Sequence, residues 1–435
     1  MRVARRRLRS DVSVERALLL LDARARDRGL PPPAALTGQW FSARAVLVPS
    51  LPAHAVTDPD VAFAAVTDLP PMSATASNTV DGAVGGGWVG YLSYQLTDPT
   101  GRKTPLPNAV WGWTDTVLVR DADGRWWFEA LVPPGSPEPA ELAAELEGLL
   151  RHGEPDPKGW TPTRLHRPPE AEHAAAVRAC VDAIAAGELF QANVCSRFTA
   201  LFDGQPAELF AEGVRRLRPR RAAYLAGSWG TVASLSPELF LARHGRRVRS
   251  TPIKGTLPRR GPADAPLAIR LRRSTKDVAE NVMITDLVRN DLGQVCRTGS
   301  VWVPELLAVT PAPGVWHLES TVEGELAEGR TDADLLRAAF PPGSVTGAPK
   351  LRALDLIAEL EHVPRGVYTG AVGMVSPVAG LELNVAIRTF ELHGTSLALG
   401  VGGGITADSD PAAEWRECLH KSAPLDALLA EPPTP

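Results

Sequence analysis

Two sets of acidic residues in the C-terminal half of the chain are spaced so that each set falls on one face of a helix. Near the end of the chain, Asp410 can cap a helix and Pro411 suits its first position. Glu414, Glu417 and Lys421 then fall at i, i+3 and i+7 on one face. A solvated helix with one Glu to Lys pair explains the same spacing, and for this segment alone that interpretation is the better one.

A second helix is predicted over residues 274–289. It carries Asp277 and Glu280 at i and i+3, with apolar residues on another side. Two such helices can present facing carboxylates. A small set of oxygen ligands suits Mg2+, which keeps several waters and uses substrate oxygens to complete its octahedron. The pattern therefore indicates a Mg2+ site for an anionic substrate.

Lysine is rare in this chain, because only six of its 46 Lys and Arg residues are lysine. One of them, Lys254, lies in the β-like segment PIKGT. It is either a lysine that protects an edge strand or an amine that, when desolvated near another cation, loses its proton and acts as a nucleophile. The scarcity of lysine favours the nucleophile.

Glu238 lies between two β-like runs, in the segment SLSPE. Partial burial there would raise the pKa of its carboxyl group and make it a proton donor. The alternative is a helix start, with Ser236 as the cap and Pro237 at the first position. The sequence leaves these two interpretations open.

The elements that position these residues are mixed helices and strands. We expect a helix over 170–186 and strands over 190–200, 231–235, 239–243 and 396–401. Consecutive strands without regular intervening helices favour an α+β fold with antiparallel sheets. The glycines at 402–404 can either expose backbone N–H groups to a carboxylate or form a plain bulge.

The N-terminal part reads differently. From residue 18 to about residue 131 we expect short β-like runs separated by Pro, Gly and Asp turns. Residues 132–169 are rich in proline around one predicted helix, 139–150, and form the best candidate linker. The sequence thus divides into an N-terminal region, 1–165, and a catalytic region, 166–430.

Bulk composition excludes several functional classes. The 435 residues are 44% hydrophobic and 22% charged, with a net charge of -4, which favours a large core and gives no field for nucleic acid or an acidic membrane. The longest apolar runs are too short for a spanning helix or a signal peptide, so we expect a cytoplasmic protein. The four cysteines lack CxxC spacing, which disfavours zinc and disulfides.

Two short motifs resemble nucleotide-binding patterns but do not meet their requirements. Gly85, Gly87 and Gly90 match GxGxxG, but the following residues read as a strand and not as the helix that a dinucleotide site needs. The segment GSVTGAPK lacks P-loop spacing. Neither dinucleotide nor ATP binding is expected.

Several long segments resemble, in the same order, the chorismate-utilising enzymes, a family that includes anthranilate, aminodeoxychorismate, isochorismate and salicylate synthases. The resemblance covers about residues 175–428. Its segments are GELFQANVCSRF, SLSPELF, STPIKGTLPR, KDVAENVMITDLVRNDLG, HLESTV, AAFPPGSVTGAPKLRA, RGVYTGAVG, AIRTF and GVGGGITADSDPAAEWRECLHK. More weakly, TGQWFSARAVLVPS and GGGWVGYLSY resemble the N-terminal region of the family.

The resemblance implies roles for individual residues. Glu280 and Glu417 would bind Mg2+, with Glu414 and Asp277 around the metal, which would hold the ring carboxylate of chorismate. The other implied substrate-site residues are Arg388 and Tyr368 at the enolpyruvyl carboxylate, Gly403 and Thr346 along the substrate, and Lys421 and His317 at the border. Lys276 and Lys350 also lie in matching segments, without an assigned step.

Two positions distinguish the branches of the family. Gln191 stands where water-adding relatives carry a lysine base, and ammonia needs no such base. C2-aminating relatives read PIAGT, whereas the C4-aminating aminodeoxychorismate synthases read PIKGT, as here. The resemblance thus implies that Lys254 attacks C2 as the C4 hydroxyl leaves, protonated by Glu238, and that ammonia then attacks C4 and expels the lysine. C2 amination, giving anthranilate or aminodeoxyisochorismate, is the alternative.

The same resemblance implies a partner and a fold. None of the four cysteines stands in a G-x-C-x-G setting, so we expect a separate glutamine amidotransferase subunit to supply ammonia. The product would be 4-amino-4-deoxychorismate, the precursor of p-aminobenzoate, for folate or for a specialised metabolite. The implied fold is an α/β sandwich of two orthogonal antiparallel sheets flanked by helices, with the N-terminal half in the same body.

Two features depart from the family pattern. Asn281 stands where many relatives have histidine, and the N-terminal motif by which some relatives bind tryptophan is not recognisable, so feedback regulation is open. A diverged small-molecule sensor would have lost acid, metal or nucleophile positions. All of these positions are present, so an enzyme is favoured.

Overall fold

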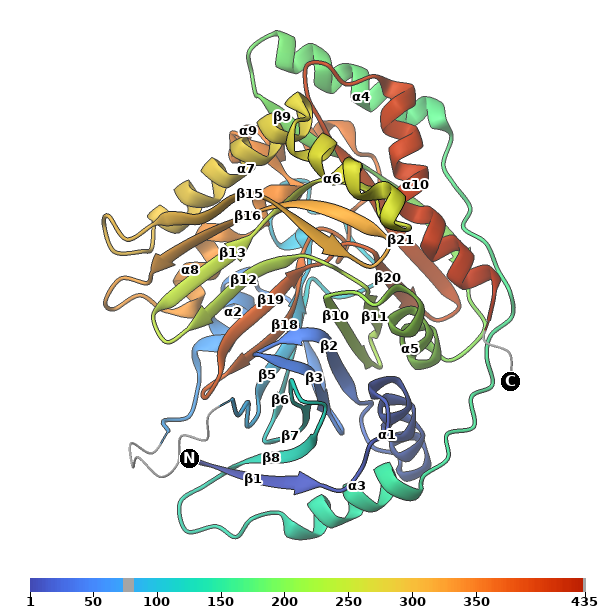
Figure 1. Ribbon diagram of the computed structural model, residues 1–435, viewed down its shortest axis with the longest axis vertical. Helices are drawn as coiled ribbons and strands as arrows, with labels where there is room; N and C mark the ends of the chain where they lie inside the picture. Colours follow the sequence, from blue (N-terminus) through green and yellow to red (C-terminus); the bar gives the residue numbers. More distant parts are fainter. Residues whose placement is uncertain (73–81, 433–435) are drawn as a thin grey trace.

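Two large antiparallel β-sheets form the centre of the molecule in the computed structural model, which describes residues 1–72 and 82–432 (Figure 1). The first sheet has eleven strands. In spatial order they are β1 (Arg2–Leu8), β8 (Trp126–Val132), β7 (Thr116–Arg120), β3 (Ala43–Val48), β2 (Ala34–Trp40), β10 (Arg221–Gly227), β11 (Gly230–Ser234), β20 (Thr389–His393), β21 (Ser396–Ile405), β9 (Gln191–Leu201) and β17 (Gly347–Ala348).

The second sheet has ten strands. Along its main path they are β14 (Ile253–Pro258), β16 (Val315–Glu325), β13 (Arg247–Thr251), β12 (Leu239–His244), β19 (Gly380–Val385), β18 (Ala371–Ser376), β5 (Gly87–Leu92), β6 (Ala109–Thr114) and β4 (Ala53–Val56). The tenth strand, β15 (Trp302–Ala312), pairs with β16. This architecture confirms the predicted α+β fold with antiparallel sheets.

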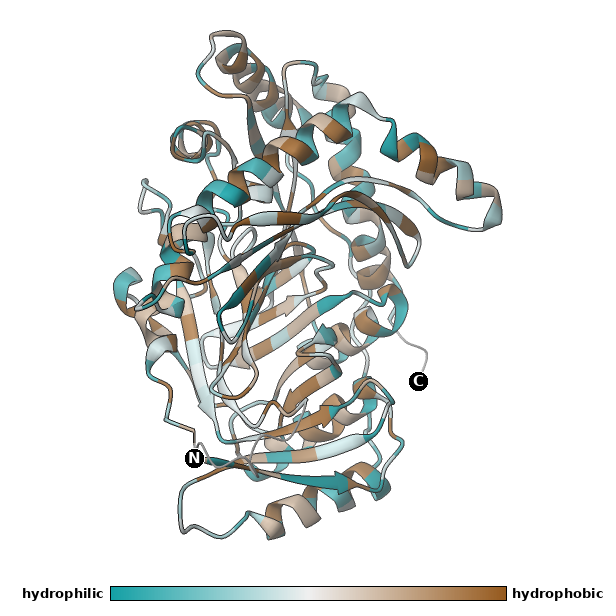
Figure 2. Cartoon of the chain, turned by 60° about the vertical axis from the view of Figure 1, so that its left-hand side comes forward, coloured by the Kyte–Doolittle hydropathy of each residue, from teal (hydrophilic) through white to brown (hydrophobic). Residues whose placement is uncertain are grey.

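Helices lie around the sheets. They are α1 (Val14–Arg28), α2 (Pro59–Ala64), α3 (Ala140–His152), α4 (Glu170–Ala185), α5 (Pro206–Leu217), α6 (Ala265–Arg272), α7 (Thr275–Gly293), α8 (Asp332–Ala339), α9 (Lys350–Leu360) and α10 (Pro411–Ala430). Short 3-10 turns are η1 (Ala65–Thr67), η2 (Tyr94–Leu96), η3 (Pro262–Asp264) and η4 (Gly343–Val345). Hydrophobic (brown) and hydrophilic (teal) residues alternate along the α-helices in Figure 2, as expected for helices that bury one side.

Three large apolar clusters hold the layers together. One joins α1, α3, α5 and α10 to the first sheet and includes Leu18, Phe210 and Leu428. A second joins α2, α7 and α8 to the second sheet, and a third contains residues from strands of both sheets, such as Val46 and Met374. The two sheets therefore share a core instead of forming separate bodies.

The helices that carry the acidic residues form as predicted. Asp410 caps α10 by accepting a hydrogen bond from the backbone of Ala413 at 2.9 Å, and Pro411 is the first helical residue. Ser274 caps α7 in the same way, through the backbone N–H of Asp277. The predicted helices over 139–150 and 170–186 correspond to α3 and α4, and the predicted strands correspond to β9, β11, β12 and β21.

One prediction for the N-terminal region is wrong. The segment from residue 18 begins inside α1 and not in a β-like run. Both ends of α1 carry ordinary helix signals, because Ser13 caps its start and Gly29 ends it in the left-handed conformation, with φ of 62°. The four consecutive leucines of α1 obscured the helical period.

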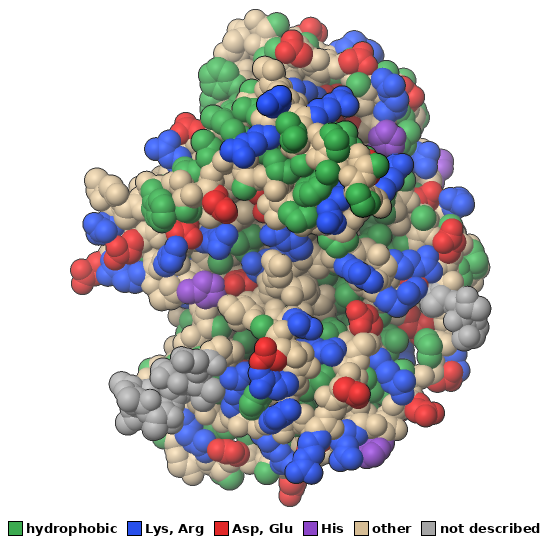
Figure 3. Space-filling view, in the orientation of Figure 1, with side chains coloured by type: hydrophobic (Ala, Val, Ile, Leu, Met, Phe, Trp, Pro, Cys, Tyr) green, Lys and Arg blue, Asp and Glu red, His purple; other side chains and the backbone are tan. Residues whose placement is uncertain are grey.

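Strands from the two sequence regions pair directly. β2 pairs with β10 in the first sheet, and β5 pairs with β18 in the second. The rejected GxGxxG motif runs into β5, as expected, with Gly87 as its first residue. In the part of the chain that the structure describes, no helix is long and apolar enough to cross a membrane. Basic and acidic side chains are interspersed on the face seen in Figure 3.

Candidate active site

Gly404 of β21 marks the point where three functional side chains meet. A Cβ atom on Gly404 would collide with Oε1 of Glu280 and with Nε2 of Gln191, and it would lie 3.1 Å from Nζ of Lys254. Oε1 of Glu280 accepts a hydrogen bond from Nζ of Lys254 at 2.6 Å and one from Nε2 of Gln191 at 3.0 Å. All three side chains are buried, so the absence of a side chain at Gly404 leaves room for this contact.

The neighbouring glycine, Gly403, faces α10. A Cβ atom on Gly403 would lie 3.2 Å from Oε2 of Glu414 and 3.8 Å from Oε1 of Glu417. Nζ of Lys421 pairs with Oε1 of Glu417 at 2.8 Å and donates to the backbone oxygen of Gly402 at 2.9 Å. The face of α10 that the spacing predicted therefore lies against the glycine run of β21.

Glu414 has a second lysine partner from α7. Oε1 of Glu414 accepts from Nζ of Lys276 at 3.0 Å and from the hydroxyl of Ser409 at 2.6 Å. Its other oxygen, Oε2, is buried and has no hydrogen-bond partner. Lys276, which had no assigned step, thus links the helix of Glu280 to the helix of Glu414.

These carboxylates provide the oxygen-only donor set that Mg2+ prefers. In this arrangement Glu280, Glu414 and Glu417 each face a lysine ammonium group. Asp277 lies beside β14, with Oδ1 3.1 Å from the position of a Cβ atom on Gly255. Among residues 1–72 and 82–432, no three carboxylate, imidazole or thiol groups gather closely enough to hold a metal ion. The donor chemistry fits Mg2+, and the unpartnered Oε2 of Glu414 is an acceptor available to it.

Glu238 lies on a loop between β11 and β12, and it is 3% exposed. Ser236 accepts a hydrogen bond from the backbone N–H of Glu238, but no helix begins here, so the alternative of a helix start is wrong. Its Oε1 accepts from the hydroxyl of Ser344 at 2.6 Å and from the backbone N–H of Ile253 at 3.4 Å. Burial raises the pKa of Glu238 to about 7, although Ser344 and the charge of Lys254 oppose that rise.

His317 and Arg388 are close enough for the charge of Arg388 to change the pKa of His317. Nδ1 of His317, on β16, lies 3.0 Å from the hydroxyl of Thr256 on β14, while its Nε2 is buried without a partner. Burial and the charge of Arg388 lower the pKa of His317 to about 3, so the ring is neutral. Arg388 has a positive φ of 51°, which places its backbone in the left-handed region just before β20. Its charge interacts with Glu238 as well.

Tyr368 and Thr346 contact β21 and β9, respectively. The ring of Tyr368 packs on Gly400, where a Cβ atom would collide with it, and its hydroxyl lies 3.8 Å from Sγ of Cys195. Thr346 is fully buried, and its backbone oxygen accepts from the backbone N–H of Asn193 at 2.7 Å. Of the predicted substrate residues, Tyr368, Thr346 and Lys421 therefore contact the β9 and β21 pair, which itself contains Gln191 and Gly403.

Asn281, which departs from the family pattern, has a local structural partner. Its side chain donates to the backbone oxygen of Leu318 at 3.0 Å and accepts from the hydroxyl of Ser320. It joins α7 to β16 and lies beside Glu280 in sequence only. Sequence reasoning missed Ser409, Thr256 and Ser344, each a small hydroxyl residue whose partner is distant or on another element.

Comparison with known proteins places this geometry in a family. The family model described as chorismate binding enzyme matches residues 54–426. Anthranilate synthase component 1 from Streptomyces coelicolor is 37% identical over 369 residues, which covers 78% of this chain and 71% of that protein. Aminodeoxychorismate synthase component 1 from Escherichia coli is 42% identical over 237 residues, covering 54% of this chain and only 52% of that protein.

The fold agrees with a solved structure. The menaquinone-specific isochorismate synthase from Escherichia coli superposes with a TM-score of 0.76 and 21% identity, covering 99% of this chain and 94% of that chain. The family match spans most of the sequence and includes every residue of the candidate site. The chain therefore belongs to the chorismate binding enzymes.

Proposed function

We propose that this chain aminates chorismate at C4, as the synthase component of an aminodeoxychorismate synthase, in the cytoplasm. The observation that carries the proposal is the position of Lys254. Its buried amine lies beside Glu280 and Gln191, and its charge also acts on Glu238. A C2-aminating relative needs no amine at this position, whereas replacement of the C4 hydroxyl with retention needs two displacements and therefore a nucleophile.

The proposed first displacement uses Lys254 and Glu238. Nζ of Lys254 must first lose one proton to solvent and give up its contact with Oε1 of Glu280. Its lone pair then forms a bond to C2, both ring double bonds shift by one position, and the C4 hydroxyl leaves as water with the proton of Glu238. A carboxyl group with a pKa of about 7 suits this step, because it holds a proton near neutral pH and still releases it readily.

The second displacement restores the enzyme. Ammonia forms a bond to C4, both ring double bonds return to their original positions, and the bond between C2 and Nζ breaks. The proton that the incoming ammonia loses returns to the Glu238 carboxylate. No pyruvate is released, so the product is 4-amino-4-deoxychorismate, the precursor of p-aminobenzoate.

Mg2+ is part of the proposal. Glu280 and Glu417 would hold it, with Glu414 and Asp277 nearby, and the free Oε2 of Glu414 supports an ion on this side of Gly403. When bound, Mg2+ would neutralise the ring carboxylate of the substrate. Lys421, Lys276 and the backbone of Gly402 to Gly404 would complete this anion-binding side, and Arg388 would face the enolpyruvyl carboxylate.

A separate glutaminase subunit would supply ammonia. Glutamine hydrolysis needs a thiolate, and burial raises the pKa of all four cysteines, to about 11 for Cys180 and Cys296 and to about 12 for Cys195 and Cys418. These thiols remain protonated near neutral pH. The two similar proteins with component 1 in their names also fit a two-subunit enzyme.

The experiment that tests this mechanism follows the lysine itself. Quenched reactions of the full chain with chorismate, Mg2+ and ammonium are analysed by intact-protein mass spectrometry, with Lys158→Ala as the control because Lys158 is exposed and pairs with Asp156. We expect an adduct on Lys254, and we expect Lys254→Ala to lose C4 amination by about a thousandfold. Aminodeoxychorismate made by Lys254→Ala at the unmutated rate would reject the nucleophile.

A further inference from the structure

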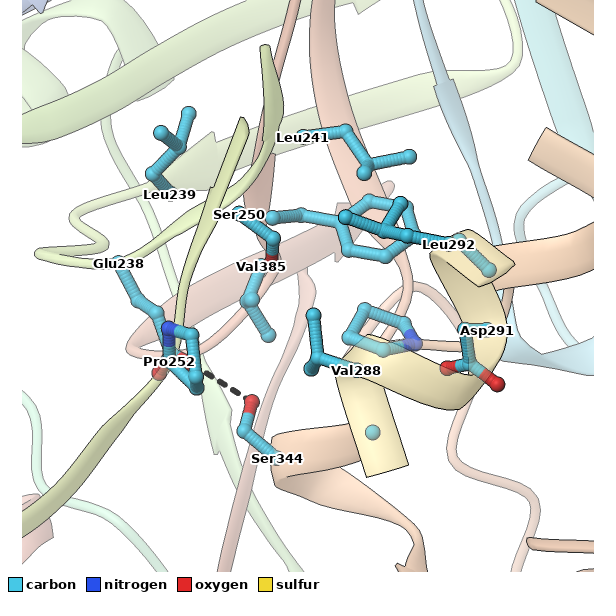
Figure 4. A pocket seen from close by; sticks show the side chains of 14 residues that line it. Glu238, Leu239, Leu241, Ser250, Pro252, Val288, Asp291, Leu292, Ser344 and Val385 are labelled. Atoms are coloured by element: carbon cyan, nitrogen blue, oxygen red, sulfur yellow. Dashed lines mark hydrogen bonds between the residues drawn. The ribbon is translucent and has the colours of Figure 1, made fainter. Parts of the chain in front are cut away.

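Glu238 rests against a narrow pocket between the second sheet, α7 and residues 339–344. Figure 4 shows Ser344 and Glu238 on one side of this pocket and Val288 and Asp291 of α7 on the other. The space between them is about 10 Å³, which is room for no more than about one water molecule. This pocket is therefore too small for the substrate, and the residues that line it pack behind Glu238, the proposed acid.

Ser344 is the contact between those lining residues and Glu238. It lies in η4, and its hydroxyl donates to Oε1 of Glu238 at 2.6 Å, with both residues buried. A hydroxyl that donates to a carboxylate stabilises the charged form. The position of η4 therefore decides how strongly this hydrogen bond stabilises the charged carboxylate of Glu238.

Lys350 fixes the segment that contains Ser344. Its Nζ donates to Oδ2 of Asp291 at 2.6 Å, to the backbone oxygen of Ala339 at 2.9 Å and to that of Pro341 at 3.1 Å. All three donors of the ammonium group are used, and both charged side chains are nearly buried, at 13% and 8% exposed. One side chain therefore ties the end of α8 and the start of the Ser344 segment to α7.

The geometry points to Lys350 and Asp291 as positioning residues for Glu238: together they hold residues 339–344 so that the Ser344 hydroxyl stays on the Glu238 carboxylate. The inference rests on the proposed function in one respect, since it takes Glu238 as the acid of C4 amination. It accounts for a buried lysine that the substrate site does not use. Lys350 contacts the acid only through the loop, so it is not a catalytic residue.

The inference predicts the protonation of Glu238. Loss of the Ser344 bond removes a stabilising contact from the carboxylate, so the pKa of Glu238 rises. The other charged or titratable groups that act on it are Lys254 of β14, Glu319 of β16 and Arg388 before β20, and these stay in place. We expect Ser344→Ala to raise the pKa of Glu238 by about one pH unit and Ser344→Thr to restore it.

The contacts by which Lys350 and Asp291 hold residues 339–344 are tested by a double variant that leaves the net charge unchanged. Lys350→Met combined with Asp291→Asn removes both charges and the donors to the loop. We expect it to raise the pKa of Glu238 as much as Ser344→Ala does, and we expect the triple variant to show no additional rise, because both changes act through one bond. The probe is the carboxyl 13C resonance of Glu238 in the full chain without substrate, assigned with Glu238→Gln.

Because this titration needs no turnover, its result is separate from whether C4 or C2 is aminated. Lys158→Met serves as the surface control. If the Lys350→Met and Asp291→Asn double variant does not fold, Asp291→Asn alone is measured. Without its partner, the positive charge of Lys350 would lower the pKa of Glu238 through space, whereas loss of the restraint on residues 339–344 would raise that pKa. An unchanged or lowered pKa in the double variant, or full additivity with Ser344→Ala, would overturn the inference.

Discussion

The site contains two groups of carboxylates in contrasting surroundings. Around Gly403 and Gly404, each glutamate faces a lysine ammonium group. At the other place stands one carboxylate, Glu238, which accepts hydrogen bonds from a hydroxyl and a backbone N–H, and burial raises its pKa to about 7. Under the proposed function, this difference would let one residue type serve two purposes, because direct cations suit a group that must stay charged to bind, and burial suits one that must carry a proton.

The largest effect should come from removing the proton donor. Glu238→Gln keeps the shape and the Ser344 contact but has no carboxyl proton to give, so we expect kcat to fall about 10² to 10⁴-fold with little change in substrate binding. Glu323→Gln is the matched control, because Glu323 is similarly buried but pairs with Arg247 near the end of β16. Steady-state kinetics corrected for folded protein measure the effect, and a Glu238→Gln enzyme of full kcat would remove the contrast between the two groups.

Replacing a glutamate that faces a lysine should weaken Mg2+ binding instead. Glu280→Ala removes a proposed Mg2+ ligand from α7, so we expect the half-saturating Mg2+ concentration to rise about 10 to 100-fold, and turnover at limiting Mg2+ to disappear. Glu417→Ala should do the same from α10. A Mg2+ titration by calorimetry and by activity measures both, and an unshifted titration in either variant would contradict the assignment.

A third effect concerns protein stability and not activity. The pKa of Glu238 is raised on folding, so its favourable contribution is complete below the unfolded pKa and is lost as pH rises toward 7. Glu238→Gln, which has no charge to bury, should therefore increase the free energy of unfolding at pH 8 by up to about 3 kcal/mol, with a smaller gain at pH 6. Denaturant unfolding at both pH values measures the gain, and an equal change at both would count against a raised pKa.

Local sequence signals predicted most elements of the site. The face of α10 followed from the spacing of Glu414, Glu417 and Lys421, and its start from Asp410 and Pro411, because caps and helical period depend on neighbours in sequence. The α+β fold followed from the order of strands and helices. The α1 helix was missed although Ser13 and Gly29 mark its ends, because a leucine run has no clear period.

Long-range partners could not be predicted from spacing. Lys276 reaches Glu414 across 138 residues, and Ser344 reaches Glu238 across 106. Such pairs depend on how the sheets and helices pack, and nothing local distinguishes Ser344 from a turn serine. The lysine partners of Glu280 and Glu414, and the residues packed behind Glu238, became visible only in the structure.

The most direct test of the central claim is the product made by the purified chain. Chorismate, Mg2+ and ammonium salt are supplied, and the product is identified by mass and fluorescence, with glutamine in a parallel reaction. The account predicts 4-amino-4-deoxychorismate with no pyruvate released, and no turnover with glutamine until a glutaminase subunit is added. Fluorescent anthranilate with released pyruvate would contradict C4 amination, and turnover with glutamine by the single chain would contradict the separate source of ammonia.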